Sequence, residues 1–337
     1  METPSITDIN SFIDVQFAQS YYFNFYRKHG FPNYRPEDYN PVEILKSIEK
    51  FDETTIFNDG ILGQTMHGCG FLWTFFPHWI DVKTYNDKSL RDNWNDDEKL
   101  WSLIKKTINW NIKHGGGRWT TNRIRQNAKV YCSKQTPSNF RPTAAKYIYN
   151  AYGDCGAVYD PCGGFGGRLL GFLASNCSEY VCCEPCEKTY RGLLDMRDKA
   201  FPYVGKSVDI VNDVAESYVP QRGHFDLCFT SPPYFDTEKY SDEPTQSYIA
   251  HPTYERWVSG FLTPMIRNCN RALKMNSYLV LNVANTKTAK TLEKDTVRSA
   301  LENGFSLKEI NWLALSSISG RGTKLEPIFV FEKESEV

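Results

Sequence analysis

The second half of the chain alternates short apolar runs with segments of helical periodicity. The apolar runs predict buried strands at 157–160, 180–185, 208–213, 225–230, 277–285, 305–315 and 326–333. Helices are predicted between them at 167–175, 187–201, 254–273 and 291–303. Strands that are apolar throughout, alternating with helices, are typical of a mainly parallel, doubly wound α/β sheet with helices on both faces. We therefore predict a Rossmann-like sheet domain, whose ligands bind at the carboxyl ends of the strands.

The first 135 residues follow a different pattern. One helix is well marked, because Leu100, Ile104, Ile108 and Ile112 form an apolar stripe. The residues Asn95–Glu98 before it resemble a capping box. Strand-like runs are less regular here. We predict a mostly helical N-terminal domain over 1–135, with a role in target recognition, and the sheet domain over 136–337.

Composition describes an ordinary globular chain with an uneven charge distribution. Of 337 residues, 41% are apolar and 23% are charged, and the net charge is −1. Taken alone, that net charge argues against a strongly basic nucleic-acid binder. From residue 99 to residue 153, however, there are eleven Lys and Arg and no Asp or Glu. This asymmetry is the first functional clue.

Within the basic stretch, cations alternate with Trp119 and with Asn and Thr side chains. Such a pattern is typical of phosphate neutralisation with some base stacking. The alternative is a solvated helix face that pairs with the acidic N-terminal residues. The predicted nucleic-acid-binding residues are Arg118, Arg123, Arg125 and Lys129.

Neither the N-terminus nor the cysteines point to secretion. The first residues lack a basic segment followed by an apolar one, and the apolar run at 69–76 is too short for a membrane span. Because no secretory signal peptide is predicted, the ten cysteines are expected to be reduced thiols, and a cytoplasmic location is expected. Cys182, Cys183 and Cys186 contain one CxxC but have no second pair, so no metal site is predicted.

A glycine-rich turn, Asp160-Pro161-Cys162-Gly163-Gly164-Phe165-Gly166-Gly167, joins the first predicted strand of this domain to a helix. Glycines let the backbone approach a ligand closely. No Lys-Ser/Thr follows them, so a nucleoside-triphosphate loop is not predicted. Alone, such a turn serves many cofactors or only packing.

Two acids follow at the ends of the next strands. Glu184 ends the second strand, where a carboxylate can accept both hydroxyls of a ribose. Asp213 ends the third, where a carboxylate can accept from an adenine amine. Each acid, taken singly, is equally well explained as a helix cap or a solvated strand end.

The decisive element is Ser231-Pro232-Pro233-Tyr234, directly after the fourth strand. Two prolines remove two backbone donors and fix φ, so the segment forms a rigid turn rather than continuing the strand. A side-chain oxygen, an outward carbonyl and an aromatic face suit an exocyclic amine on a stacked base. A plain loop anchor is the alternative.

Together these motifs resemble the S-adenosylmethionine-dependent amino-methyltransferases that modify N4 of cytosine or N6 of adenine in nucleic acids. The resemblance spans about 139–337. It implies S-adenosylmethionine as cofactor, S-adenosylhomocysteine as product, and Ser231, Pro232, Pro233 and Tyr234 as the catalytic motif. Asn139, Phe140 and Arg141 resemble the segment that closes over the methionine end. The implied cofactor contacts are Asp160, Pro161, Gly163, Gly164, Gly166, Glu184, Asp213, Asn139, Phe140 and Arg141.

The resemblance implies a DNA base amine as substrate, with N4 of cytosine favoured because the motif begins with Ser. N6-adenine methylation, an RNA base-amine methyltransferase and a non-catalytic nucleic-acid-binding relative stay open. The resemblance implies a role either in host defence by restriction–modification or as a viral modification enzyme. Strandedness and oligomeric state are not predicted.

The chain departs from the family in its target-recognition region. Only 17 residues separate Asp213 from Ser231, which leaves no room for a recognition domain there. Recognition would then come from the first 135 residues or from the loop 235–257, through Tyr240, Gln246 or Tyr248. That acidic loop is equally well explained as a surface connection.

Overall fold

The computed structural model describes residues 12–84, 87–114, 119–131, 136–202, 204–315 and 323–337. The chain forms two compact units. The first comprises Met1–Asn33 and His78–Pro137, and the second Tyr34–Pro77 and Ser138–Val337. Residues 34–77, which we expected in the N-terminal domain, therefore belong to the unit that holds the sheet.

The second unit is built on a sheet with nine strands in the described residues. They are β1 (Phe57–Asn58), β2 (Ile61–Leu62), β3 (Ala157–Asp160), β4 (Glu179–Cys183), β5 (Ser207–Val211), β6 (Phe225–Thr230), β7 (Leu273–Asn282), β8 (Phe305–Leu315) and β9 (Lys324–Lys333). Their spatial order is β1-β2-β8-β9-β7-β6-β3-β4-β5. Neighbours from β7 to β5 pair in parallel, and β9 is antiparallel to both β7 and β8. The predicted mainly parallel sheet is confirmed.

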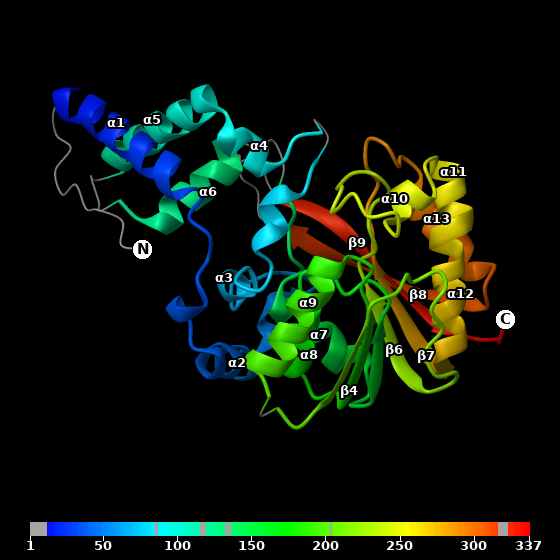
Figure 1. The fold of residues 1–337 in the computed structure, drawn as a ribbon. Coiled ribbons are helices and arrows are strands. Elements are labelled where there is room, and N and C mark those ends of the chain that lie inside the picture. The colour runs from blue at the N-terminus through cyan, green and yellow to red at the C-terminus, as the bar shows by residue number, and fades with distance from the viewer. Residues whose placement is uncertain (1–11, 85–86, 115–118, 132–135, 203, 316–322) are drawn as a thin grey trace. The chain divides into compact units, whose positions relative to one another are not determined.

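Helices cover both faces of this sheet. Figure 1 shows α7, α8 and α9 on one face and α11, α12 and α13 on the other. The helices of this unit are α2 (Pro41–Glu49), α3 (Cys69–Leu72), α7 (Pro142–Tyr152), α8 (Gly167–Leu173), α9 (Glu187–Asp195), α10 (Ser247–Ala250), α11 (Tyr254–Trp257), α12 (Thr263–Ala272) and α13 (Leu292–Leu301). The helix predicted over 254–273 is α11 and α12 joined by a π-helical turn at Val258–Leu262. The doubly wound, Rossmann-like architecture is confirmed.

The strand order reverses beside β3. From β3 the chain moves outward to β4 and β5, then returns to β6 on the other side of β3. At such a switch point the two connections leave in opposite directions, and open α/β sheets commonly bind ligands there, at the carboxyl ends of the strands. The glycine-rich turn follows β3 and the Ser-Pro-Pro-Tyr motif follows β6, so both lie at this switch point.

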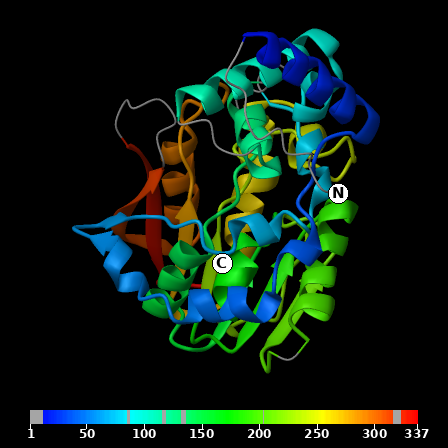
Figure 2. The ribbon, with the colours of Figure 1, turned by 90° about the vertical axis from the view of Figure 1, so that its left-hand side faces the viewer.

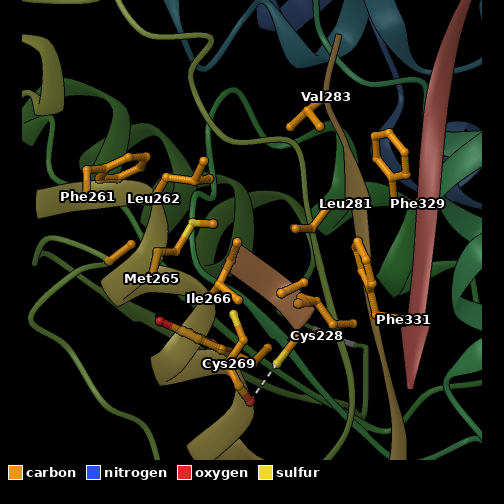
Figure 3. Packing of buried hydrophobic residues seen from close by; sticks show 14 of the residues in the cluster. Cys228, Phe261, Leu262, Met265, Ile266, Cys269, Leu281, Val283, Phe329 and Phe331 are labelled. Carbon is orange, nitrogen blue, oxygen red and sulfur yellow. Dashed lines mark hydrogen bonds between the residues drawn. The ribbon is translucent and has the colours of Figure 1, made fainter. Parts of the chain in front are cut away.

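Helix α12, part of the helix predicted over 254–273, buries its apolar side chains against the sheet. Figure 3 shows Met265, Ile266 and Cys269 of α12 facing residues of β6, β7 and β9. Met265, Ile266 and Cys269 are fully buried. The thiol of Cys228 on β6 donates to the carbonyl of Cys269 over 3.8 Å, so this cysteine packs as a small apolar residue.

The first unit is helical in its described residues. Its helices are α1 (Phe12–His29), α4 (Leu90–Asn95), α5 (Asp97–Lys113) and α6 (Thr121–Tyr131). Figures 1 and 2 show α1, in blue, beside α5, in cyan. The capping residue of α5 is Asp96, which accepts from the Lys99 amide, and the reciprocal capping box lies at Ser89 and Asp92 of α4. The capping box expected at Asn95–Glu98 is therefore wrong.

Trp119 is part of the core of this unit. Its ring stacks on Tyr22 at 3.9 Å, and its Nε1 donates to the Tyr26 hydroxyl over 3.0 Å. Only 2% of Trp119 is exposed. The prediction that it stacks on nucleic-acid bases is wrong, because both its ring and its N–H are used inside the unit.

None of the helices in the described parts of the chain has both the length and the apolar character needed to cross a bilayer.

Candidate functional site

A fully buried carboxylate, Asp160, joins the glycine-rich turn to the Ser-Pro-Pro-Tyr motif. Asp160 ends β3, and its Oδ1 accepts from the Thr230 hydroxyl at the end of β6 over 2.8 Å. The same oxygen accepts from the Cys162 amide over 3.2 Å. Because Thr230 immediately precedes Ser231, this bond fixes the start of one motif against the start of the other.

The second oxygen of Asp160 is equally occupied. It accepts from Arg168 Nε over 2.7 Å and from the Tyr180 hydroxyl over 2.8 Å. Arg168 also donates to the Cys162 carbonyl, which closes the turn. Asp160 is 0% exposed, so it holds the turn, and contact with a ligand would require this arrangement to open. Sequence reasoning missed Arg168, although a lone arginine in the apolar run GRLLGFL is a visible signal.

Asn139 holds the other end of the turn. Its Nδ2 donates to the Phe165 carbonyl over 2.6 Å, and its Oδ1 accepts from the Gly167 amide over 3.1 Å. The first amide of α8 is therefore already bonded. Arg141 in turn donates to the Asn139 carbonyl over 3.2 Å. The predicted segment before the turn thus lies against it.

The glycines have the conformations that the turn requires. Gly164 has φ +57° and Gly166 has φ +73°, values that favour glycine. A Cβ at Gly163 would lie 3.1 Å from Cys182 Sγ and 3.2 Å from Leu193 Cδ1, which is tight. At Gly164 a Cβ would meet no atom closer than 3.7 Å. The backbone at Gly164 is therefore approachable. The remaining predicted contacts differ in exposure: Pro161 is buried, whereas Phe140 is half-buried with its ring edge-on to Phe229 at 5.3 Å.

Glu184 is bound to this turn from the neighbouring strand. Its Oε2 accepts from the Gly164 amide and its Oε1 from the Cys186 amide, both over 2.9 Å. Burial raises the pKa of Glu184 to about 7, and the two amide hydrogen bonds act in the opposite direction. Each oxygen keeps a second lone pair, so the carboxylate can still accept from two ligand hydroxyls.

Asp213 lies two residues beyond β5, and β5 pairs with β4, the strand that ends directly before Glu184. The side chain of the preceding Asn212 donates to the Glu184 carbonyl over 2.9 Å. Asp213 is exposed, and its Oδ1 accepts from the Val214 amide over 2.7 Å. The structure thus brings Glu184 and Asp213 to consecutive strand ends, as the sequence indicated.

Tyr234 is held at the carboxyl end of β7. Its hydroxyl donates to the Asn282 carbonyl over 3.3 Å and to Glu326 over 3.5 Å. Burial raises the pKa of Tyr234 far above its usual range, and the Glu326 charge adds to this, whereas a hydrogen bond with Ser231 lowers it. Tyr234 is therefore a neutral phenol at physiological pH and cannot serve as a base. Sequence reasoning missed Asn282 and Glu326, which lie 48 and 92 residues beyond Tyr234.

The turn after Tyr234 contains an acid that sequence reasoning also missed. Phe235 has φ +57°, and its ring packs on Tyr254 and Trp257 at 5.8 and 6.0 Å. The following residue, Asp236, has a buried Oδ1 without a hydrogen-bond partner among the described residues. An unpaired buried carboxylate oxygen is costly, which is typical of a group that meets a ligand or water.

The loop beyond this turn is folded against the glycine-rich turn. The Tyr240 ring lies edge-on to Phe165 at 5.9 Å, and its hydroxyl donates to Glu238. Glu243 accepts from the Glu187 amide at the start of α9 over 3.2 Å. Gln246 is buried, and the Tyr248 hydroxyl donates to the Ser241 carbonyl over 2.7 Å. The loop is thus a packed element beside the site.

The predicted nucleic-acid-binding residues fall into different environments. Arg118 lies outside the described residues. Arg125 is 6% exposed, and its Nη1 donates to the carbonyls of Pro32 and Asn33. It holds the first unit together, so its predicted phosphate contact is wrong in this conformation. Lys129 lies over the Trp79 ring at 4.5 Å, and Arg123 over the Trp110 ring at 3.6 Å.

No group of three or more His, Cys, Asp or Glu side chains that could hold a metal ion occurs in the described ranges.

Comparisons with known proteins find similarity only among solved structures. No protein-family model matches the chain, and no curated protein matches it. TrmN from Thermus thermophilus matches with a TM-score of 0.39 at 16% identity, over 57% of this chain and 48% of that one. A putative RNA methyltransferase from Pyrococcus horikoshii matches with 0.38 at 13% identity, over 58% and 83%. A SAM-dependent O-methyltransferase from Thermotoga maritima matches with 0.39 at 12% identity, over 62% and 71%. The chain thus spans about half the length of TrmN, and its function has to be inferred from its own site.

Proposed function

We propose that the chain transfers a methyl group from S-adenosylmethionine to the exocyclic amine of a nucleic-acid base. The observation that carries this proposal is the Thr230–Asp160 hydrogen bond. This bond joins the Ser-Pro-Pro-Tyr motif, which suits an exocyclic amine, to the glycine-rich turn, which suits a nucleoside. Glu184 is hydrogen-bonded to the same turn. DNA is the proposed substrate, with N4 of cytosine favoured over N6 of adenine.

The residues at the switch point fit an adenosine-containing cofactor. Gly164 offers an approachable backbone, Glu184 has lone pairs for two ribose hydroxyls, and the exposed Asp213 can accept from an adenine amine. When bound, S-adenosylmethionine supplies an electrophilic methyl group on a positively charged sulfur. The protein must then align the amine with that methyl group, because an in-line displacement depends mainly on geometry.

Ser231 and the Pro232 carbonyl are proposed to accept the two amine hydrogens. These hydrogen bonds favour a more tetrahedral and more nucleophilic nitrogen. As the C–N bond forms and the C–S bond breaks, the nitrogen gains a positive charge and then releases one proton. Asp236, two residues after the motif, has a buried oxygen without a hydrogen-bond partner among the described residues, and we propose it as the acceptor of that proton.

Tyr234 is proposed to replace the stacking that a base loses when it leaves a duplex or a single strand. Its hydroxyl bonds to Asn282 and Glu326 fix the ring rather than take part in proton transfer. The ring and the hydroxyl can therefore be tested separately. Tyr234→Ala removes both, and Tyr234→Phe removes only the hydroxyl.

The test is transfer of a labelled methyl group to duplex DNA, single-stranded DNA and RNA of one sequence, with the product nucleoside identified. Ser231→Ala should lower turnover by about 100-fold or more, and Tyr234→Ala should do the same. Tyr234→Phe should keep a large part of the activity. Binding of S-adenosylhomocysteine, measured by calorimetry, should be preserved in all three variants.

Near-normal turnover of Ser231→Ala would show that the catalytic assignment is wrong. N4-methylcytosine, N6-methyladenine or a methylated ribonucleoside as product decides among the three enzymatic alternatives. Cofactor binding without transfer to any of the three nucleic acids would overturn the proposed substrate class.

A further inference from the structure

Helices α5 and α6 of the first unit form an antiparallel pair with a surface of cations and aromatic rings. Thr107 of α5 and Asn127 of α6 hydrogen-bond across their buried seam over 3.1 Å. Beside this seam Arg123 lies over Trp110, and Lys106 lies over Tyr131 at 5.3 Å. We call this surface the cationic face, defined as Lys106, Trp110, Lys113, His114, Arg123 and Tyr131.

The helical repeat places the α5 members on one side. Residues four, seven and eight positions after Lys106 lie on the same face of a helix, and these are Trp110, Lys113 and His114. Lys106, Lys113, His114 and Tyr131 are exposed, and Arg123 is half-buried. The repeat that points Leu103, Ile104 and Ile108 into the core therefore points the cations outward.

Arg123 is oriented by stacking instead of by an ion pair. Its guanidinium lies 3.6 Å from the centre of the Trp110 ring, and the His114 ring is stacked on Trp110 at 4.1 Å and 17°. Stacking uses the flat face of the guanidinium and leaves its edge N–H groups for bidentate contacts with oxyanions. Less side-chain entropy is lost on binding when the group is already held in place.

The cations of this face differ from other cations of the same unit, which form ion pairs with carboxylates. Arg27 pairs with Asp97, and Arg91 pairs with Asp81. Among the described residues, no carboxylate forms an ion pair with Lys106, Lys113 or Arg123. No Asp or Glu occurs between residues 99 and 153 either, so the face has no acid of its own segment to neutralise it.

We propose that the cationic face binds the phosphate backbone of a nucleic acid. Lys106 and Lys113 are seven residues apart, which is about 10 Å along the helix, so they reach different phosphates. Tyr131, 41% exposed beside Lys106, adds an aromatic surface for a sugar or base. The choice of nucleic acid over another polyanion rests on the proposed function. In this proposal the cationic face makes the contacts with nucleic acid that the sequence analysis assigned to Arg125 and Trp119.

The experiment measures binding of the full chain to labelled duplex DNA, single-stranded DNA and RNA over a series of KCl concentrations. The test variant combines Lys106→Gln, Lys113→Gln and Arg123→Gln. Because each neutralised phosphate contributes about 0.9 to the salt slope for a duplex and about 0.7 for a single strand, the slope should become shallower by about 2 to 3. A control with Lys50→Gln, Lys188→Gln and Lys294→Gln makes the same change in net charge at exposed positions and should keep the wild-type slope.

Arg123→Lys tests the stacking separately, because it keeps the charge but loses the planar group. It should keep the slope and weaken binding several-fold. Circular dichroism confirms that each variant is folded. An unchanged slope in the triple variant, or equal loss in the control, would overturn the proposal. Equally tight, salt-dependent binding of polyglutamate through the same residues would assign the face to an acidic polypeptide instead.

This result is independent of methyl transfer. Ser231→Ala should bind nucleic acid with the wild-type slope, because Ser231 belongs to the other unit. A shallower slope in the triple variant together with no transfer to any nucleic acid would refute the proposed function and leave the cationic face standing. Methyl transfer by the wild type together with an unchanged salt slope in the triple variant would support the proposed function and refute the cationic face.

Discussion

The two buried carboxylates of the site are held in different ways, and this gives them different roles. Asp160 has partners on both oxygens from four residues and is 0% exposed, so its bonds hold the turn and join it to Thr230. Glu184 accepts a single amide on each oxygen and stays 7% exposed. Glu184 therefore has lone pairs that are free to accept hydrogen bonds, and with a pKa of about 7 it changes its charge within the physiological pH range.

Glu184 should make cofactor binding depend on pH. The hydroxyls of a ribose donate more strongly to the carboxylate than to the acid, so the bound ligand lowers the pKa from about 7. Affinity for S-adenosylhomocysteine should therefore rise with pH below 7, by up to about tenfold per unit, and level off above it. Calorimetry at several pH values measures this, and Glu184→Gln should bind more weakly with no pH dependence below 7. A pH-independent affinity in the wild type would exclude the role.

The same group should affect stability with a defined sign. Its pKa in the folded protein, about 7, exceeds the ordinary value of 4.5, so the folded state holds more protons between these values. The unliganded protein should therefore lose stability as pH rises through this window. Urea unfolding of the wild type and of Glu184→Gln checks the sign. A stability that rises more steeply with pH in the wild type than in the variant would contradict it.

At the scale of elements, α9 depends on a distant loop for its N-terminal cap. Its own capping residue, Cys186, makes no side-chain cap hydrogen bond. Glu243, 56 residues away, accepts from the Glu187 amide in the first turn. A carboxylate at a helix N-terminus is favourable both as an acceptor and through the helix dipole. The loop after the Ser-Pro-Pro-Tyr motif and the helix after Glu184 therefore stabilise each other.

Glu243→Ala should release this link. We expect a loss of about 1 kcal/mol in the free energy of unfolding, as for removal of a helix cap, and faster hydrogen exchange at the Glu187 amide. Exposed Glu302, after the last turn of α13, offers the control Glu302→Ala, which should change neither quantity appreciably. Unchanged exchange at Glu187 in Glu243→Ala would show that the cap contributes nothing.

At the scale of the whole molecule, residues 34–77 complete the sheet unit although most of the first unit follows them in sequence. Strand β2 adds to β8 in parallel, pairing Ile61 with Trp312. A buried lysine on α7 fastens the same segment, since Lys146 donates to the carbonyls of Ile48, Glu49 and Phe51. It also pairs with Glu53 over 2.8 Å. The segment is therefore held at the sheet edge and at α7.

Lys146→Met should be strongly destabilising. It leaves three backbone carbonyls without the Lys146 donor and the half-buried Glu53 without its cation, although the Asn150 side chain still donates to Glu53. Loss of one member of a buried ion pair costs about 3 kcal/mol or more. Urea unfolding measures the loss. The control is Lys274→Met. Lys274 is half-exposed and pairs with Asp226, so its replacement should lower the free energy of unfolding by no more than about 1 kcal/mol. Equal losses in the two variants would mean that the buried cluster does not fasten the segment.

The sequence by itself determined the elements from β3 to β9 and the two chemical motifs. Parallel strands buried on both faces appear as continuous apolar runs, and a turn with Gly164 and Gly166 at positive φ needs glycine, so both leave a local signal. Only the tertiary structure decided the role of Arg125, which meets Pro32 and Asn33, and of Trp119, which stacks on Tyr22. It also decided that residues 34–77 join the sheet, that Asn282 holds Tyr234, and that Lys106, Lys113 and Arg123 are the outward cations. The physical reason is that the burial of a polar or aromatic side chain depends on partners far away in the chain, and no local pattern records them.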